Sequence, residues 1–69
     1  MNNIKNIDDL RNVMTAENMT VYQFIKEFQK TNKIRKNSIY DWFNNNQLPP
    51  ARIEQINIVL KNYFDEKAK

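Results

Sequence analysis

The stretch RKNSIYDWFNNNQLPPARIEQI, residues 35–56, decides the fold of this 69-residue chain. Ile39, Trp42 and Phe43 recur at spacings of three and four, which place them on one side of a helix. Three asparagines and two prolines then interrupt the pattern, and a second apolar period begins after them. Because residues before a proline favour extended backbone, the stretch predicts two helices joined by a short connection that contains Leu48.

The polar start of the first of these helices has two interpretations. Arg35, Lys36, Asn37 and Ser38 are either an ordinary polar helix start or a surface that reads DNA. Arginine is a poor N-cap, whereas asparagine and serine are good ones. We therefore expect the helix to begin near position 37, with Asn37 or Ser38 as its cap, and to end at the three asparagines of positions 44–46.

A helix is predicted upstream, over residues 7–17. Ile7, Leu10, Val13 and Met14 repeat at helical spacing and form one apolar stripe. The chain contains no glycine, so asparagine is the best available residue for a left-handed backbone position. We expect Asn18 to take that position directly after the helix.

The next helix has the clearest start signal in the chain. Thr20 and Gln23 form a Thr-x-x-Gln capping box, and Met19 and Phe24 are spaced for a hydrophobic staple. The helix is expected to end within residues 29–32. Its buried face is expected to consist of Phe24, Ile25 and Phe28.

A last helix is predicted over residues 51–64, with Pro50 suited to its first turn. The charged tail, residues 65–69, is expected to fray. The fold class is therefore all-α, a compact bundle of four short helices with Trp42 near its centre. We expect one domain over residues 1–69, with a core at about 7–64 and flexible ends at 1–5 and 65–69. The apolar positions of the last helix are Ile53, Ile56, Val59, Leu60, Tyr63 and Phe64.

Composition narrows the possible functions. The chain has neither histidine nor cysteine, which removes the commonest proton shuttle and the commonest metal ligands. We expect no cofactor and no metal site, and we expect that the chain is not an enzyme. No apolar run reaches the length of about 20 residues that spans a bilayer. A cytoplasmic protein is the prediction.

Positive charge is concentrated in one short segment. Residues 26–36 hold five lysines and arginines against one glutamate, a balance of +4, whereas the net charge of the whole chain is only +3. Clustered positive charge attracts an anionic partner. A solvated helix face is the plainer alternative.

Residues 19–56 carry a resemblance to a known family. Met19 and Thr20 before an apolar helix, Ile39 and Trp42 on the next one, and LPPAR at positions 48–52 resemble the Cro and lambda-repressor-like helix-turn-helix family. The resemblance covers about residues 7–64 and implies a Cro-like repressor of phage or mobile-element origin. About four additional residues, 29–32, separate the two central helices, so a helix-turn-helix with a lengthened inter-helix turn is expected.

This family reads DNA with the N-terminal end of the second helix of the motif. Arginine pairs with guanine, asparagine with adenine, and an acidic side chain accepts from cytosine. The resemblance therefore implies binding of double-stranded DNA. The candidate DNA-binding residues are Lys33, Arg35, Lys36, Asn37, Ser38, Tyr40, Asp41, Asn44 and Asn45, and Asn46 is a further candidate for phosphate contact.

Two questions about partners stay open in the sequence. Tyr63 and Phe64 are candidate contacts of a homodimer, as in family members that bind paired half-sites, but the same rings are equally suited to close the core of a monomer. The alternative function is a protein-binding antirepressor or inhibitor that uses the helix-turn-helix scaffold, with a repressor as its partner. Asp41 and the altered turn between the two central helices keep this alternative open. Asp41 either accepts from cytosine or pairs with a neighbouring cation and faces away from the DNA.

Overall fold

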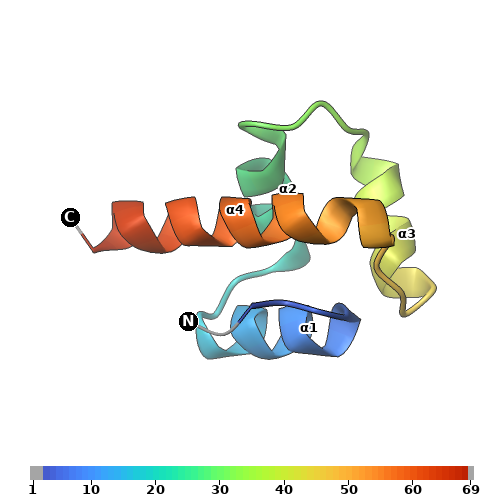
Figure 1. Ribbon diagram of the computed structural model, residues 1–69, viewed down its shortest axis with the longest axis horizontal. Coiled ribbons are helices and arrows are strands. Elements are labelled where there is room, and N and C mark those ends of the chain that lie inside the picture. Colours follow the sequence, from blue (N-terminus) through green and yellow to red (C-terminus); the bar gives the residue numbers. More distant parts are fainter. Residues whose placement is uncertain (1–2, 69) are drawn as a thin grey trace.

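Four helices make up most of the part of the chain that the structure describes, residues 3–68 of a computed structural model (Figure 1). They are α1 (Ile7–Ala16), α2 (Val21–Gln29), α3 (Lys36–Asn44) and α4 (Pro50–Lys67). Residues 3–68 contain no strand. The prediction of an all-α bundle of four helices is therefore confirmed.

Both α1 and α3 end in a Schellman motif built around an asparagine. After α1, Asn18 has a φ of 54°, and the N–H of Met19 donates to the carbonyl of Met14 at 2.8 Å. After α3, Asn46 has a φ of 56°, and the N–H of Gln47 donates to the carbonyl of Trp42 at 3.0 Å. Asparagine thus fills the left-handed position that glycine usually occupies, and the prediction for Asn18 is confirmed.

The start of α2 is fixed by the predicted capping box. The hydroxyl of Thr20 accepts from the N–H of Gln23 at 3.1 Å, and the side-chain oxygen of Gln23 accepts from the N–H of Thr20 at 2.9 Å. At the other end, the backbone N–H and the side-chain amide of Asn32 both donate to the carbonyl of Phe28. These bonds satisfy backbone groups that the helix itself leaves unpaired.

Aromatic rings form the centre of the core. The ring of Phe28 meets Trp42 edge-on at 5.6 Å between centroids, and Phe24 meets Phe43 edge-on at 6.2 Å. This arrangement confirms that Trp42 lies near the centre. The buried side chains are Ile4, Ile7, Leu10, Met14, Met19, Phe24, Ile25, Phe28, Ile39, Trp42, Leu48, Ile56, Val59 and Leu60.

The N-terminal limit of the predicted core is wrong, because Ile4 is only 2% exposed and belongs to the core. The side chain of Asn57 in α4 holds this residue by its backbone. Its oxygen accepts from the N–H of Ile4 at 2.7 Å, and its nitrogen donates to the carbonyl of Ile4 at 3.1 Å. The amide side chain of Asn57 therefore bonds both the N–H and the carbonyl of Ile4, as a residue on a neighbouring strand would.

The predicted end of the last helix is also wrong, because α4 continues past Phe64 to Lys67. The ammonium group of Lys67 forms an ion pair with Glu17 at 2.6 Å, which joins the end of α4 to the end of α1. The start agrees with the prediction, since Pro50 occupies the first turn. Its missing N–H costs nothing there.

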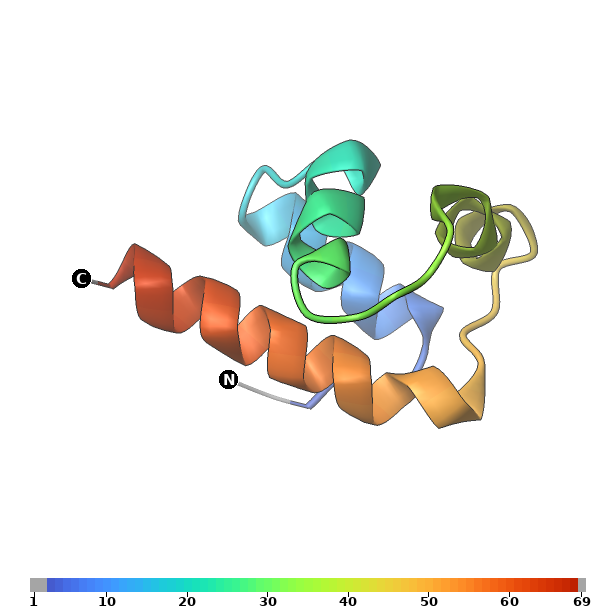
Figure 2. The same ribbon diagram turned by 90° about the horizontal axis from the view of Figure 1, so that it is seen from above.

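The helices pack with α1, α2 and α3 on one side of α4 (Figure 2). Helices α1 and α4 run in the same general direction in both views, whereas α2 and α3 lie crosswise to each other. Six residues, 30–35, connect α2 to α3 and arch away from the body of the molecule. A helix-turn-helix usually has a turn of about three or four residues, so this connection is the lengthened turn that the sequence predicts.

Candidate nucleic-acid interface

The candidate interface begins at the N-terminus of α3, where the predicted cap is wrong. The N-cap is Arg35, and its side chain makes no capping hydrogen bond within residues 3–68. Asn37 and Ser38 lie inside the first turn, where the N–H of Ser38 donates to the carbonyl of Arg35 at 3.1 Å. The first turn also lacks an acidic residue. The positive end of the helix dipole is therefore left for solvent or for an anion.

The outward face of α3 carries a polar strip. Ile39 and Trp42 are buried on the inner side of the helix. Four exposed side chains lie opposite them at helical spacing. We call these four residues the α3 strip: Asn37, Tyr40, Asp41 and Asn44. All four are exposed, so no other element of the described chain covers them.

Three of the five basic residues in the 26–36 segment are exposed and unpaired within the described part of the chain. These are Lys33, Arg35 and Lys36, which lie in the connection and in the first turn of α3. Their charge is therefore available at the same end of α3 as its open amides. We call them the basic cluster.

The other two lysines of this segment already have partners. Lys30 forms an ion pair with Glu27 at 3.0 Å, and the hydrogen bond and charge of Glu27 raise the pKa of Lys30 above its ordinary value of 10.5. The ammonium of Lys26 lies over the ring of Tyr22 at 5.1 Å from its centroid. The net attraction of the segment therefore comes chiefly from the basic cluster.

The connection before α3 is held at its far end by Gln29. Its side-chain nitrogen donates to the carbonyl of Ile34 at 3.0 Å. Ile34 in turn packs half-buried against the core. Two anchors therefore hold the residue that precedes Arg35, although the connection is longer than in an ordinary helix-turn-helix.

The far end of α3 is fastened to α1 by Arg11. One guanidinium nitrogen donates to the side-chain oxygen of Asn46, and the other donates to the carbonyl of Phe43 at 2.9 Å. The guanidinium carbon also lies 5.9 Å from the centre of the Phe43 ring. Arg11 has no place among the predicted site residues, because a contact over 32 residues leaves no local signal in the sequence. Asn44, Asn45 and Asn46 are all exposed, but only the side-chain oxygen of Asn46 is engaged in this contact.

Two other predicted residues differ from the rest of the set. Ser38 is only half-exposed, on the flank of α3 rather than on the α3 strip. Asp41 is exposed and forms no ion pair within residues 3–68, so the neighbouring cation that the sequence offered as its partner does not contact it. A carboxylate therefore stands unneutralised in the middle of the α3 strip.

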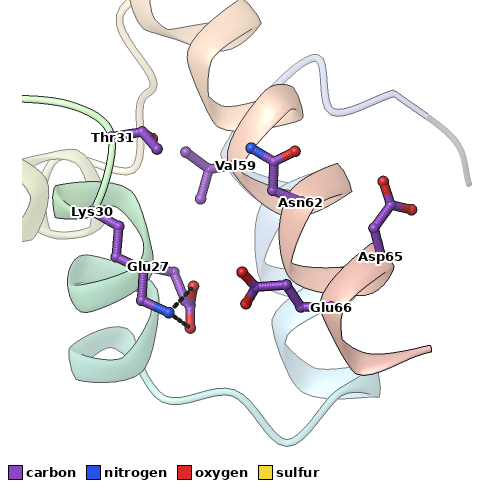
Figure 3. Close-up of a pocket in the computed structure, with 7 residues that line it drawn as sticks. All are labelled: Glu27, Lys30, Thr31, Val59, Asn62, Asp65 and Glu66. Carbon is purple, nitrogen blue, oxygen red and sulfur yellow. Dashed lines mark hydrogen bonds and ion pairs between the residues drawn. The ribbon is translucent and has the colours of Figure 1, made fainter. Parts of the chain in front are cut away.

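A hollow of about 410 Å³ lies elsewhere, between the end of α2 and the C-terminal half of α4 (Figure 3). The carboxylates of Glu27 and Glu66 point toward each other across it. Asp65 adds a third acidic residue at its edge. The lining holds three acidic residues against one lysine, Lys30, so it suits phosphate less well than the basic cluster beside α3 does. Within residues 3–68 no group of acidic side chains is arranged to hold a metal ion.

In comparisons with known proteins, no family model, no curated protein and no solved structure matches this chain. A functional proposal therefore depends on the sequence and the geometry described above. No helix in the described residues is long and apolar enough to cross a membrane.

Proposed function

We propose that this protein is a sequence-specific double-stranded DNA-binding regulator, a repressor of the Cro type, that inserts the N-terminal part of α3 into the major groove. The observation that carries the proposal is the α3 strip, which begins at an uncapped helix start beside the basic cluster. Both features stand on a helix whose opposite side is fixed in the core by Ile39 and Trp42.

The chemistry of the exposed groups matches the requirements of base reading. Asn37 has the amide that pairs with adenine, and Arg35 has the fork that pairs with guanine. An α-helix with its side chains is about 10–12 Å in diameter, and the major groove is about 12 Å wide, so α3 is of a size to enter it. The proposed roles of Tyr40, Asn44 and Asn45 are contacts along the groove wall.

The two lysines of the basic cluster have a different task from Arg35 in this proposal. Lys33 and Lys36 lie at the edges of the reading surface, where side chains meet phosphates rather than base edges. Each phosphate that they neutralise releases counterions, which makes affinity fall with added salt. Two such contacts correspond to a slope of about −1.8 in a plot of log affinity against log salt.

Fluorescence anisotropy with labelled duplex at several salt concentrations tests the proposal directly. The duplexes are a random sequence and the DNA upstream of the protein's own gene. Lys33→Gln is expected to weaken binding to both and to reduce the slope by about one. Lys5→Gln is the matched control, because Lys5 is exposed but belongs to neither the basic cluster nor the α3 strip. Absence of salt-dependent binding to either duplex would reject the proposal.

Asp41 favours a second candidate function, a protein-binding antirepressor or inhibitor. Its unpaired carboxylate stands where a DNA ligand would bring phosphates, and a basic partner surface would suit it better. The variant Asp41→Asn separates the two. DNA binding by α3 predicts equal or higher affinity for random duplex. A protein partner, such as a repressor, predicts weaker capture of that partner and no salt-dependent DNA binding by the wild type.

A further inference from the structure

The outward face of α4 is distinct from the DNA-binding candidates and exposes a large apolar side chain. Ile58 is 50% exposed, although isoleucine is normally among the most buried residues. Beside it an open groove of about 810 Å³ runs along α4, with Pro50 and the half-buried Ile53 in its lining and Asn3 of the N-terminal segment at its edge. The other three helices all lie on the opposite side of α4 (Figure 2).

The exposed stripe through Ile58 has an ordered charge pattern. Ala51, Glu54, Ile58, Lys61 and Asp65 are all exposed and are spaced by three and four residues, so they form one line along the helix. Glu54 stands one turn before Ile58, about 6 Å along the axis, and Lys61 about 4.5 Å after it. Opposite charges therefore flank the exposed isoleucine at nearly equal distances.

This symmetry makes the face complementary to itself. If two α4 helices lie antiparallel with Ile58 against Ile58, each Glu54 comes opposite the Lys61 of the other copy, within about 1.5 Å along the axis. In a parallel pairing, each Glu54 would instead face Glu54 and each Lys61 would face Lys61. Such like-charge contacts are destabilising, so the charges select the antiparallel arrangement.

We propose that the outward face of α4 binds a second copy of this chain, in an antiparallel, twofold-symmetric dimer centred on Ile58. A twofold interface uses the same patch on both subunits, so the patch must be complementary to itself, as this face is. Tyr63 and Phe64, the dimer contacts suggested by the sequence, are half-buried and pack against the core of their own chain. The dimer goes beyond the proposed DNA binding, and its test contains no nucleic acid.

Sedimentation equilibrium of the full chain tests the dimer over concentrations from roughly 1 µM to 1 mM. The wild type is expected to shift from monomer to dimer within this range. Ile58→Asp places two like charges on the twofold axis and is expected to weaken association at least about tenfold. Tyr22→Asp is the matched control, because Tyr22 is 58% exposed but lies on α2 outside the groove. Circular dichroism and thermal melting establish that both variants fold.

Charge exchange tests the orientation. Glu54→Lys alone and Lys61→Glu alone each bring like charges together and are expected to weaken the dimer. The double variant restores both pairs in the antiparallel arrangement and is expected to dimerise like the wild type. A wild type that stays monomeric, or an Ile58→Asp variant that dimerises as well as Tyr22→Asp, would overturn the proposal. Failure of the double variant to recover would overturn the antiparallel pairing.

Discussion

The guanidinium group of Arg11 in α1 donates a hydrogen bond to the backbone carbonyl of Phe43, 2.9 Å away, in the last turn of α3. The same group binds the side chain of Asn46, so one residue holds two atoms at the end of the proposed reading helix. Because α1 is itself packed in the core through Leu10 and Met14, Arg11 fixes α3 relative to the rest of the protein.

Arg11→Ala is expected to lower the free energy of unfolding by about 1 kcal/mol, since it removes two exposed hydrogen bonds to a charged donor. Urea denaturation followed by circular dichroism measures the change. Arg11→Lys retains the charge but not the planar fork, so it is expected to lose most of the same stability. If the lysine variant were as stable as the wild type, charge rather than geometry would explain the contact.

Trp42→Ala is expected to cost about 3–5 kcal/mol of stability, because it removes a ring that is 7% exposed and packed edge-on against Phe28. Tyr40→Ala is the matched control. Tyr40 lies two residues earlier on the same helix but faces solvent, and its loss is expected to change stability by less than about 0.5 kcal/mol. Denaturation curves for the two variants that superimpose would show that Trp42 does not belong to the core.

Local signals explain which parts of the fold are predictable from sequence. The capping box of Thr20 and Gln23 and the left-handed Asn18 depend on residues within a few positions, so their outcome is fixed by local chemistry. Periodicity likewise identifies the buried faces of α2 and α3, because a helix places every third or fourth residue on one side.

The errors arise where distant residues decide the structure. Ile4 is buried because Asn57 binds its backbone, and these residues are 53 positions apart. The tail continues as helix to Lys67, whose ion pair with Glu17 spans 50 positions. At Arg35 the cap rule fails for another reason: a helix can start without a side-chain cap when Ile34 and Ile39, on either side of the start, pack on the core.

The left-handed conformation of Asn18 leads to a prediction about glycine. Asn18→Gly is expected to retain or slightly raise stability, because glycine adopts positive φ without steric cost. Asn18→Ala is expected to lose about 1–2 kcal/mol, because its Cβ is strained at this φ. Thermal melting compares the two. Asn12→Ala, an exposed asparagine inside α1, is expected to be neutral or stabilising, and an equal loss there would indicate that the φ of Asn18 is not the cause.

The ion pair between α4 and α1 predicts a dependence on pH. The hydrogen bond and charge of Glu17 raise the pKa of Lys67 above its ordinary value of 10.5. The pair therefore contributes stability fully below pH 10.5, and this contribution is lost as the pH rises through the folded-state pKa. The effect is expected to be small and reduced by salt, because Lys67 is exposed.

Thermal melts between neutral pH and pH 11 detect this loss as a difference between wild type and Lys67→Gln. The difference is expected at neutral pH and should shrink toward the alkaline end. Lys5→Gln is the control, since it removes an exposed lysine that lies outside the ion pair and outside α4. A gap between wild type and Lys67→Gln that persisted unchanged at high pH would contradict a charge-based contribution.

The proposed reading residues differ from the phosphate-binding lysines in what their loss should do to sequence preference. Arg35→Ala and Asn37→Ala are each expected to weaken binding to a specific site by about 1–3 kcal/mol, while binding to random duplex changes less. Lys36→Ala is expected to weaken both by similar factors, because phosphates are the same in every sequence. Anisotropy titrations at one salt concentration measure the affinities of all three variants.

Both Arg35→Ala and Asn37→Ala leave the buried face of α3 untouched, so helicity is expected to match the wild type. Unchanged discrimination between specific and random duplex in both variants would remove the start of α3 from the reading surface, whatever the total affinity.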